Sequence, residues 1–241
     1  MAVVLTGCEL AVQRQSHGKY AGDVGAIEKF YNHFLCKKKQ YMIEDILNNE
    51  AINKHLLIFD LDGTLINTDD VNYLAYKEAI QKVKNLDLAL LHKNDERFTR
   101  EELYLIIEDL TSQEYENIIE IKNDVYKKYL KKSKVNMFVV KIIEKFSQSN
   151  KIVLATNSHR NRAQIILRYH SLTNLFDHIF CKEDYKNQKN NKFKHVLNNL
   201  NIDPNLAIVF ENDNKEIKKA ILSGIPDKNI VTFNNKDKEY E

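Results

Sequence analysis

Short apolar runs alternate with amphipathic helical patterns along much of the chain. The first run, Leu56 to Phe59, is too short and too uniformly apolar for an amphipathic helix, so it predicts a strand buried on both faces. The predicted strands cover residues 56–59, 151–156, 179–180, 206–210 and 229–233. Helical patterns after the second strand cover residues 161–169, 193–200 and 215–222. This alternation predicts an α/β fold, a Rossmann-like parallel sheet with helices on both faces.

The stretch between the first two predicted strands carries helical patterns throughout. Residues 69–83 and 135–146 have apolar positions at helical spacing, and Thr99–Glu102 and Thr111–Glu114 are capping-box pairs. We therefore expect an inserted all-α domain at 69–149 within a core formed by 55–68 and 150–234. Two further helical patterns, at 26–41 and 41–53, predict a helical N-terminal extension over residues 1–54, and residues 235–241 are a charged tail.

Two carboxylates follow the first predicted strand directly. Asp60 and Asp62 stand one residue apart, ahead of Gly63 and Thr64. Ligands of parallel sheets bind beyond the carboxyl ends of the strands, and a carboxylate buried there needs a cation or a charged ligand. If the strand geometry persists through this pair, both carboxylates point the same way. One can then attack an electrophile while the other transfers protons.

The segment Phe-Asp-Leu-Asp-Gly-Thr-Leu at 59–65 resembles the first motif of the haloacid dehalogenase superfamily. That superfamily consists mostly of Mg²⁺-dependent phosphatases and phosphomutases on a Rossmann-like fold. The resemblance implies that Asp60 is a nucleophile that becomes an aspartyl-phosphate and that Asp62 is the general acid and base. The dehalogenase branch lacks the second Asp, so Asp62 favours phosphoryl transfer. The insert at 69–149 resembles the helical C1 cap of the phosphoglycolate phosphatase and β-phosphoglucomutase-like members.

Two later segments resemble further motifs of this superfamily. Thr156, Asn157 and Ser158 follow the second predicted strand, where the resemblance implies a hydroxyl and a backbone N–H that hold a phosphate oxygen. We expect Thr156 to be catalytic, and Thr64, Asn157, Ser158 and Lys192 to bind substrate. Glu211, Asn212 and Asp213 follow a later strand and resemble the acidic motif that binds Mg²⁺ together with Asp60 and Asp62. The chain departs from the motif at Asn212, a neutral ligand that lowers the charge available to the metal.

The superfamily also has one lysine that neutralises the crowded carboxylates and the phosphate. Several lysines stand between residues 182 and 194, and the Lys-Pro signature common in relatives is absent. Counting back from the acidic motif favours Lys189 as the catalytic lysine, with Lys192 as the second choice and Lys186 as the third. Most lysines in this stretch are expected to be solvated surface charges.

Net charge, the length of the apolar runs and the cysteine pattern indicate which partners and which cellular compartment to expect. The chain of 241 residues has a net charge of +2, so overall charge gives no special attraction to nucleic acid. Its apolar runs are too short to span a bilayer. Three widely spaced cysteines show no metal-binding pattern and favour a reducing, cytoplasmic compartment. The expected partner is a small phosphorylated substrate, and the sequence leaves the oligomeric state open.

The leading hypothesis is a Mg²⁺-dependent phosphatase acting on a small metabolite, and three alternatives stay open. A phosphomutase would use the same nucleophile. A phosphatase acting on nucleic-acid ends is a less favoured alternative, suggested by His159, Arg160 and Arg162. A catalytically impaired descendant that binds phosphorylated ligands or proteins is suggested by Asn212 and by the unclear choice of lysine.

Overall fold

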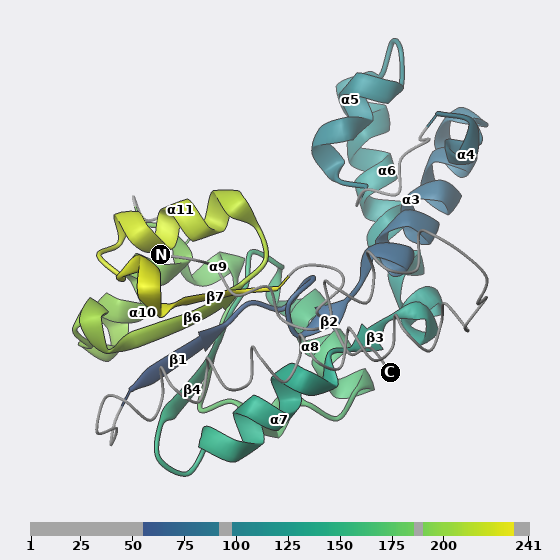
Figure 1. The fold of residues 1–241 in the computed structure, drawn as a ribbon. Coiled ribbons are helices and arrows are strands. Elements are labelled where there is room, and N and C mark those ends of the chain that lie inside the picture. The colour runs from purple at the N-terminus through teal and green to yellow at the C-terminus, as the bar shows by residue number, and fades with distance from the viewer. Residues whose placement is uncertain (1–54, 92–97, 186–189, 234–241) are drawn as a thin grey trace, which may run out of the picture. The chain divides into compact units, whose positions relative to one another are not determined.

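The computed structural model describes residues 55–91, 98–185 and 190–233. Its main sheet contains five parallel strands in the order β5-β4-β1-β6-β7. In chain order these strands are β1 (Leu56–Phe59), β4 (Lys151–Ala155), β5 (His178–Phe180), β6 (Ala207–Glu211) and β7 (Ile230–Thr232). Figure 1 shows α10 and α11 on one side of this sheet and α7 on the other. The predicted parallel α/β sheet is therefore confirmed.

Strand β1 lies at the centre of the sheet because apolar side chains cover both of its faces. Leu56 and Ile58 belong to a core cluster that also contains side chains of α10 and α11. On the opposite face, the ring of Phe59 stacks on Phe210 at 4.3 Å between centroids. All four residues of β1 are fully buried, and burial of each large apolar side chain is worth roughly 1.5–3 kcal/mol.

The helices of the sheet domain follow the predicted alternation closely. The α-helices are α7 (Met137–Phe146), α8 (Arg160–Tyr169), α9 (Lys182–Tyr185), α10 (Lys192–Leu200) and α11 (Asn214–Leu222). Short 3₁₀ turns complete the connections, namely η3 (Thr173–Leu175), η4 (Pro204–Leu206) and η5 (Asp227–Asn229). Asn191 caps α10 by accepting hydrogen bonds from the N–H groups of Phe193 and Lys194, both at 3.0 Å. This cap fixes Lys192 as the first residue of the helix.

A helical insert, defined here as residues 69–132, separates β2 (Ile66–Asn67) from β3 (Lys134–Val135), which pair antiparallel. Its elements are α3 (Asp69–Lys84), α4 (Leu88–Leu91), η1 (Arg100–Glu102), α5 (Leu103–Ile106), α6 (Ser112–Val125) and η2 (Tyr126–Lys132). The insert has its own apolar core, which includes Tyr76, Ile80, Phe98, Leu103 and Ile118. The capping box predicted at Thr111 is confirmed, since Glu114 accepts from the Thr111 N–H at 2.9 Å and donates its own N–H to the Thr111 hydroxyl at 3.2 Å.

Helix α7 packs beside the sheet, although the sequence analysis placed it in the insert. The Phe138 ring meets Phe233 edge to face, with centroids 6.0 Å apart, and Phe233 in turn stacks on Phe210 of β6. Val139 and Ile143 are fully buried on the same helix. The boundary predicted at residue 149 therefore includes a helix whose apolar face belongs to the sheet.

Within the described parts of the chain, no helix is long and apolar enough to cross a membrane. The helices predicted at 26–41 and 41–53, and the tail after residue 234, lie outside the described residues.

Candidate active site

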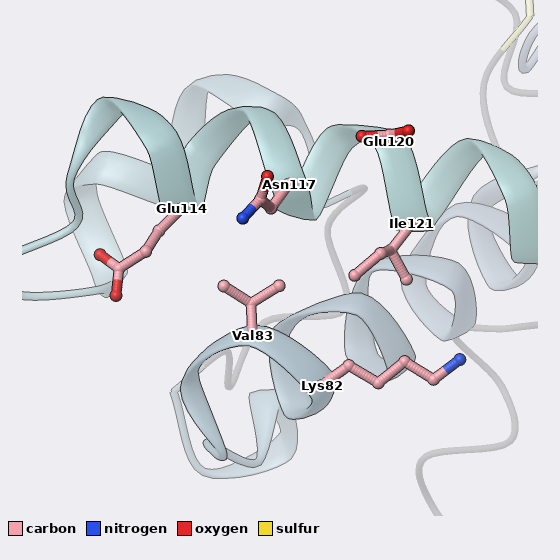
Figure 2. Close-up of a pocket in the computed structure, with 6 residues that line it drawn as sticks. All are labelled: Lys82, Val83, Glu114, Asn117, Glu120 and Ile121. Carbon is pink, nitrogen blue, oxygen red and sulfur yellow. The ribbon is translucent and has the colours of Figure 1, made fainter.

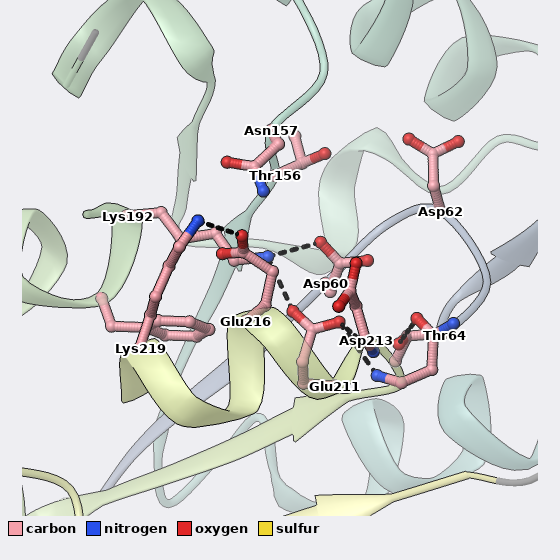
Figure 3. A network of polar contacts seen from close by, with 12 residues as sticks. Asp60, Asp62, Thr64, Thr156, Asn157, Lys192, Glu211, Asp213, Glu216 and Lys219 are labelled. Carbon is pink, nitrogen blue, oxygen red and sulfur yellow. Dashed lines mark hydrogen bonds and ion pairs between the residues drawn. The ribbon is translucent and has the colours of Figure 1, made fainter. Parts of the chain in front are cut away.

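Charged side chains gather beyond the carboxyl ends of β1, β4 and β6 (Figure 3). Asp60 follows β1, Thr156 follows β4, and Asn212 follows β6. Because β1 pairs with both β4 and β6, the ends of these three strands meet at one edge of the sheet. Lys192 reaches the same place from the first turn of α10. The structure thus brings Asp60 together with Lys192 and Asn212, which lie more than a hundred residues further along the chain.

Asp60 is a buried carboxylate with one cationic partner. Its N–H donates to the Phe210 carbonyl at 3.0 Å, which fixes the residue beside β6. Its Oδ1 accepts from Lys192 Nζ at 2.7 Å. Burial, and then the nearby Glu211 carboxylate, raise the pKa of Asp60 to about 7, while Lys192 opposes both effects. A further cation at this carboxylate would therefore be bound in competition with a proton.

Lys192 is the cation that separates two buried carboxylates. Its Nζ donates to Asp60 and to Glu211 Oε2, each at 2.7 Å, and its side chain is 1% exposed. Burial acts to lower the pKa of Lys192, but Asp60 and Glu211 outweigh it and raise the pKa, so the ammonium group stays charged. This is the role that the sequence analysis expected of a lysine in this part of the chain.

Lys192 was the second choice for this role on the sequence, and the first choice, Lys189, is not tested by the structure. Lys189 was favoured by counting, but Lys189 and Lys186 lie outside the described residues. Lys192, the second choice and an expected substrate-binding residue, makes both carboxylate contacts. Counting could not find it because the position depends on where α10 begins, which the Asn191 cap decides.

Glu211 organises the turn that follows β6. Its Oε1 accepts from the N–H groups of Asn212 at 2.9 Å and of Asp213 at 3.0 Å, while Oε2 accepts from Lys192. Both carboxylate oxygens are therefore engaged within the protein. Asp213 is exposed and caps α11 by accepting from the Lys215 N–H at 2.7 Å.

Asn212 contacts the loop that follows β1. Its Oδ1 accepts from the Thr64 hydroxyl at 3.1 Å, and Thr64 is fully buried. Gly63 has a φ of +89°, and a Cβ added there would lie 2.6 Å from Asn212 Nδ2. The glycine is therefore required twice, by its backbone conformation and by the approach of Asn212. Thr64 thus ties this loop to Asn212, in the turn that follows β6.

Asp62 is withdrawn from the cluster that contains Asp60. Its Oδ1 accepts from the Thr68 hydroxyl at 2.5 Å and from Arg162 Nη2, and its Oδ2 accepts from the Ser158 hydroxyl at 2.5 Å. Figure 3 shows its carboxylate pointing away from that of Asp60. The expectation that both carboxylates point the same way is wrong, because β1 ends at Phe59 and these three donors turn Asp62 aside.

Thr156 and Asn157 stand on the other side of Asp60, at the end of β4 (Figure 3). The Thr156 hydroxyl accepts from the Ser158 N–H at 3.1 Å. The Tyr185 hydroxyl lies 2.7 Å from the Thr156 carbonyl and 2.8 Å from Asn157 Oδ1. Tyr185 thus fixes this turn, a support that the sequence analysis did not identify.

Three further residues of the site were missed on the sequence, namely Thr68, Tyr185 and Glu216. Glu216 is buried in the first turns of α11 and accepts from Lys219 Nζ at 2.6 Å (Figure 3). The sequence did hold a signal for it, because Glu216 lies beside the apolar Ile217 and four residues before Ala220 on an amphipathic helix. A carboxylate on the buried side of a helix needs a partner or a function.

The donor atoms of this site suit a hard cation. No group of three or more His, Cys, Asp or Glu side chains that could hold an ion occurs among residues 55–91, 98–185 and 190–233. Asp60 and Asn212 offer a carboxylate and an amide oxygen at neighbouring strand ends. Mg²⁺ commonly binds through one or two carboxylates together with substrate phosphate and water, so the residues present fit a magnesium ion.

The insert has a separate hollow between α3 and α6 (Figure 2). Its volume is about 450 Å³, and its lining residues are Lys82, Val83, Glu114, Asn117, Glu120 and Ile121. None of them belongs to the cluster around Asp60. The lining mixes charges of both signs, and its carboxylates, Glu114 and Glu120, stand on a helix of the insert and not at a strand end beside a buried lysine. The strand-end site is therefore the better candidate.

Comparisons with known proteins agree with this geometry. Residues 57–227 match the model of the haloacid dehalogenase-like hydrolase family. A phosphorylated carbohydrates phosphatase of Thermotoga maritima is 27% identical over 177 residues, which are 70% of this chain and 81% of that protein.

Solved structures show the same fold. A predicted phosphoglycolate phosphatase from Haemophilus somnus superposes with a TM-score of 0.60 at 19% identity, covering 74% of this chain and 83% of the other. A candidate beta-phosphoglucomutase from Thermotoga maritima gives 0.55 at 22% identity, covering 76% and 95%.

Proposed function

Because the chain belongs to the haloacid dehalogenase-like hydrolase family, we propose that it is a Mg²⁺-dependent phosphatase that forms an aspartyl-phosphate on Asp60. The family and the phosphatase names of its relatives agree with the predicted enzyme class, a phosphoric monoester hydrolase. The observation that carries the proposal is the buried contact of Asp60 with Lys192, at the end of the central strand. A nucleophile in this position is screened from water and charge-compensated.

Catalysis would proceed in two displacements at phosphorus. A carboxylate oxygen of Asp60 attacks the phosphorus atom, and the bond to the leaving oxygen breaks. Asp62 gives that oxygen a proton, then accepts one from the water that attacks the aspartyl-phosphate, which releases phosphate and restores Asp60. Lys192 offsets part of the negative charge of Asp60 and Glu211. Such chemistry depends mainly on positioning and on compensation of charge.

The phosphoryl group would bind between Asp60 and the turn at the end of β4. The Thr156 hydroxyl and the Asn157 N–H are assigned to its oxygens, because a strand end followed by a helix start is a common anion site. Ser158 is assigned a different task, since its hydroxyl donates to Asp62. Tyr185 holds the turn in place.

Mg²⁺ would be held by the side chains of Asp60 and Asn212, with Asp213 at the exposed rim as a further candidate. When bound, the ion compensates the charge on the phosphate oxygens. Glu211 supports the Asn212 turn through two backbone N–H groups. With Asn at 212, the site offers less negative charge than a second carboxylate would give.

The substrate is proposed to be a small phosphorylated metabolite. This rests on the name of the Thermotoga maritima relative, which acts on phosphorylated carbohydrates. A phosphomutase would use the same residues and would differ by returning the phosphate to substrate. Release of inorganic phosphate therefore separates the two.

We test the proposal by hydrolysis of p-nitrophenyl phosphate with and without Mg²⁺, on the wild type, Asp60→Asn and Asp87→Asn. Asp87 is an aspartate of the insert outside this site and serves as the matched control. The expected result is Mg²⁺-dependent turnover in the wild type and in Asp87→Asn, and a loss of at least about a thousandfold in Asp60→Asn. Equal activity in Asp60→Asn and the wild type would overturn the proposal.

The domain organisation and cellular location are proposals as well. We propose that the helical insert, residues 69–132, acts as a cap domain on a core formed by 55–68 and 133–233, with α7 in the core. Residues 1–54 are proposed to be an N-terminal extension. A cytoplasmic location is supported by the free thiol of the buried Cys181.

A further inference from the structure

Asp62 is held by donors from three separate segments. Thr68 directly precedes α3, Ser158 belongs to the turn after β4, and Arg162 lies in the first turn of α8. In this arrangement the carboxylate points away from Asp60 (Figure 3). To protonate the leaving oxygen when Asp60 attacks phosphorus, Asp62 must first break its hydrogen bonds with these donors. The strength of the three contacts therefore sets how readily Asp62 can act.

Arg162 is the charged member of this set. Its Nη2 donates to Asp62 Oδ1, and the exposed fraction of its side chain is 21%, against 9% for Asp62. Burial acts to lower the pKa of Arg162, but Asp62 and Tyr126 outweigh it and raise the pKa, so the guanidinium stays charged. All three hydrogen bonds to the Asp62 carboxylate are charge-assisted, but only Arg162 adds the attraction of an opposite charge, so this contact resists rotation of Asp62 more than either hydroxyl does.

Arg162 also contacts the insert. Its guanidinium lies over the ring of Tyr126, 5.0 Å from the centroid, and Tyr126 is a buried residue of η2. Lys122 of α6 lies over the same ring at 4.7 Å and over Tyr76 of α3 at 5.2 Å. The contacts thus continue from Asp62 through Arg162 and Tyr126 into the helices of the insert.

A second contact joins α8 to the end of the insert. His170, which follows α8, is hydrogen-bonded through Nε2 to the Ser133 hydroxyl at 2.7 Å. Ser133 is the first residue after η2. Helix α8 is therefore attached to η2 and its end at two points, Arg162 and His170, and a shift of η2 would act directly on Arg162.

We propose that Arg162 is a positioning residue that holds Asp62 in its withdrawn orientation and releases it when Tyr126 of the insert moves. The inference rests on the proposed function, in which Asp62 is the general acid and base. Substrates that engage the insert would free Asp62 to turn toward the leaving oxygen. Small phosphate esters that do not contact the insert would leave Asp62 bound to Arg162 and therefore unable to protonate the leaving oxygen. Arg162 would thus contribute to substrate selectivity without touching substrate.

The test compares two phosphate esters whose leaving groups differ in their need for a proton. β-Glycerol phosphate releases an alkoxide that requires the acid, whereas p-nitrophenyl phosphate releases a stabilised phenolate that requires it little. Arg162→Met removes the guanidinium and keeps most of the side-chain length over Tyr126. Arg160→Met is the matched control, because Arg160 lies on the same helix but pairs with Asp184 at 2.5 Å.

The expected result is a rise of about three- to tenfold in kcat for β-glycerol phosphate in Arg162→Met, with KM within about twofold of the wild type, because a single charge-assisted contact no longer opposes rotation of Asp62. The p-nitrophenyl phosphate rate should change less, and Arg160→Met should match the wild type on both esters. A fall in kcat by the same factor on both esters, or no change on either, would overturn the proposal.

Two further measurements keep the inference separate from protein folding and from the proposed function. Tyr126→Leu removes the aromatic face and should raise the β-glycerol phosphate rate in the same direction as Arg162→Met, by a smaller factor. Crystal structures of the wild type and Arg162→Met should show Asp62 turned toward Asp60 only in the variant. An unchanged Asp62 orientation contradicts the inference even if no ester is hydrolysed, whereas a turned Asp62 without turnover contradicts the proposed function alone.

Discussion

Carboxylates at the carboxyl edge of the sheet and in the helical insert differ in their burial and in the direction of their pKa shifts. At the sheet edge, the buried carboxylates of Asp60 and Glu211 both contact the ammonium group of Lys192, and burial raises the pKa of Asp60 to about 7. In the insert, Glu78 accepts from Lys128 at 2.7 Å and pairs with Lys82 at 2.8 Å near the surface, and these donors lower its pKa to about 2. Asp60 and Glu78 both have cationic partners, but only Asp60 is buried away from solvent.

This difference shows that the buried charges at the sheet edge reduce the stability that apolar residues in their place would give. A buried ion pair often stabilises a protein less than apolar residues of the same volume would, yet breaking it leaves an uncompensated charge. Surface pairs contribute little in either direction. The charges at the sheet edge are therefore explained by chemistry, and those of the insert by solubility and modest helix stabilisation. Four substitutions can break or sharpen this contrast.

Removing the buried cation should have the largest effect. Lys192→Met leaves Asp60 and Glu211 facing each other without compensation, so we expect a loss of activity of at least about a thousandfold and a loss of about 3–5 kcal/mol in the free energy of unfolding. Urea denaturation and phosphate release measure the two effects. Lys194→Met, on the exposed side of the same helix, is the control and should change neither. A stable, active Lys192→Met would contradict the assignment of this lysine.

Removing the buried carboxylate of Asp60 should stabilise the metal-free protein at neutral pH. The pKa of Asp60 is raised from its ordinary value of 3.8 to about 7, so the folded state binds a proton more tightly than the unfolded state. The stabilisation from that proton is complete below about pH 4 and is lost as the pH rises through 7.

Asp60→Asn carries no such charge, so its melting temperature in EDTA should exceed that of the wild type at pH 7. We expect a gain on the order of 2 kcal/mol, which shrinks toward pH 4. A gain of the same size at both pH values would show that electrostatics is not its cause.

Adding a carboxylate at the proposed Mg²⁺ site should strengthen binding of the ion. Asn212→Asp supplies a second negative charge beside Asp60, and we expect the dissociation constant for Mg²⁺ in the absence of substrate to fall about tenfold. Isothermal titration calorimetry measures this directly, without reference to turnover. Asn214→Asp, two residues further along and exposed, is the matched control. Equal affinities in the two variants would place the ion away from Asn212.

The smallest effect belongs to the insert. Glu78→Gln should lower the free energy of unfolding by less than about 1 kcal/mol at pH 7, because solvent screens this pair. The pKa of Glu78 is lowered from 4.5 to about 2, so its contribution is present above about pH 4.5 and is lost as the pH falls toward 2. Thermal melts at pH 7 and pH 3 test this, with Glu120→Gln as the surface control. A loss of several kcal/mol in the free energy of unfolding would contradict the expected difference between the insert and the sheet edge.

Local patterns in the sequence determined the fold class and the position of Asp60, the proposed nucleophile. Four apolar residues followed by Asp60 are a strand whose carboxyl end carries a charge, and both statements depend only on neighbouring residues. The alternation of strands and helices after residue 150 is equally local, as is the capping box at Thr111. The family motif at 59–65 adds the chemistry to this local signal.

Tertiary structure alone decided which lysine pairs with Asp60 and where Asp62 points. Several lysines in the stretch before α10 are equivalent by local pattern, and only the packing of α10 beside β1 and β6 places Lys192 between two carboxylates. The withdrawal of Asp62 depends on Ser158 and Arg162, about a hundred residues away. Side-chain electrostatics acts across space, so the sequence names the charged residues, but the fold selects their partners.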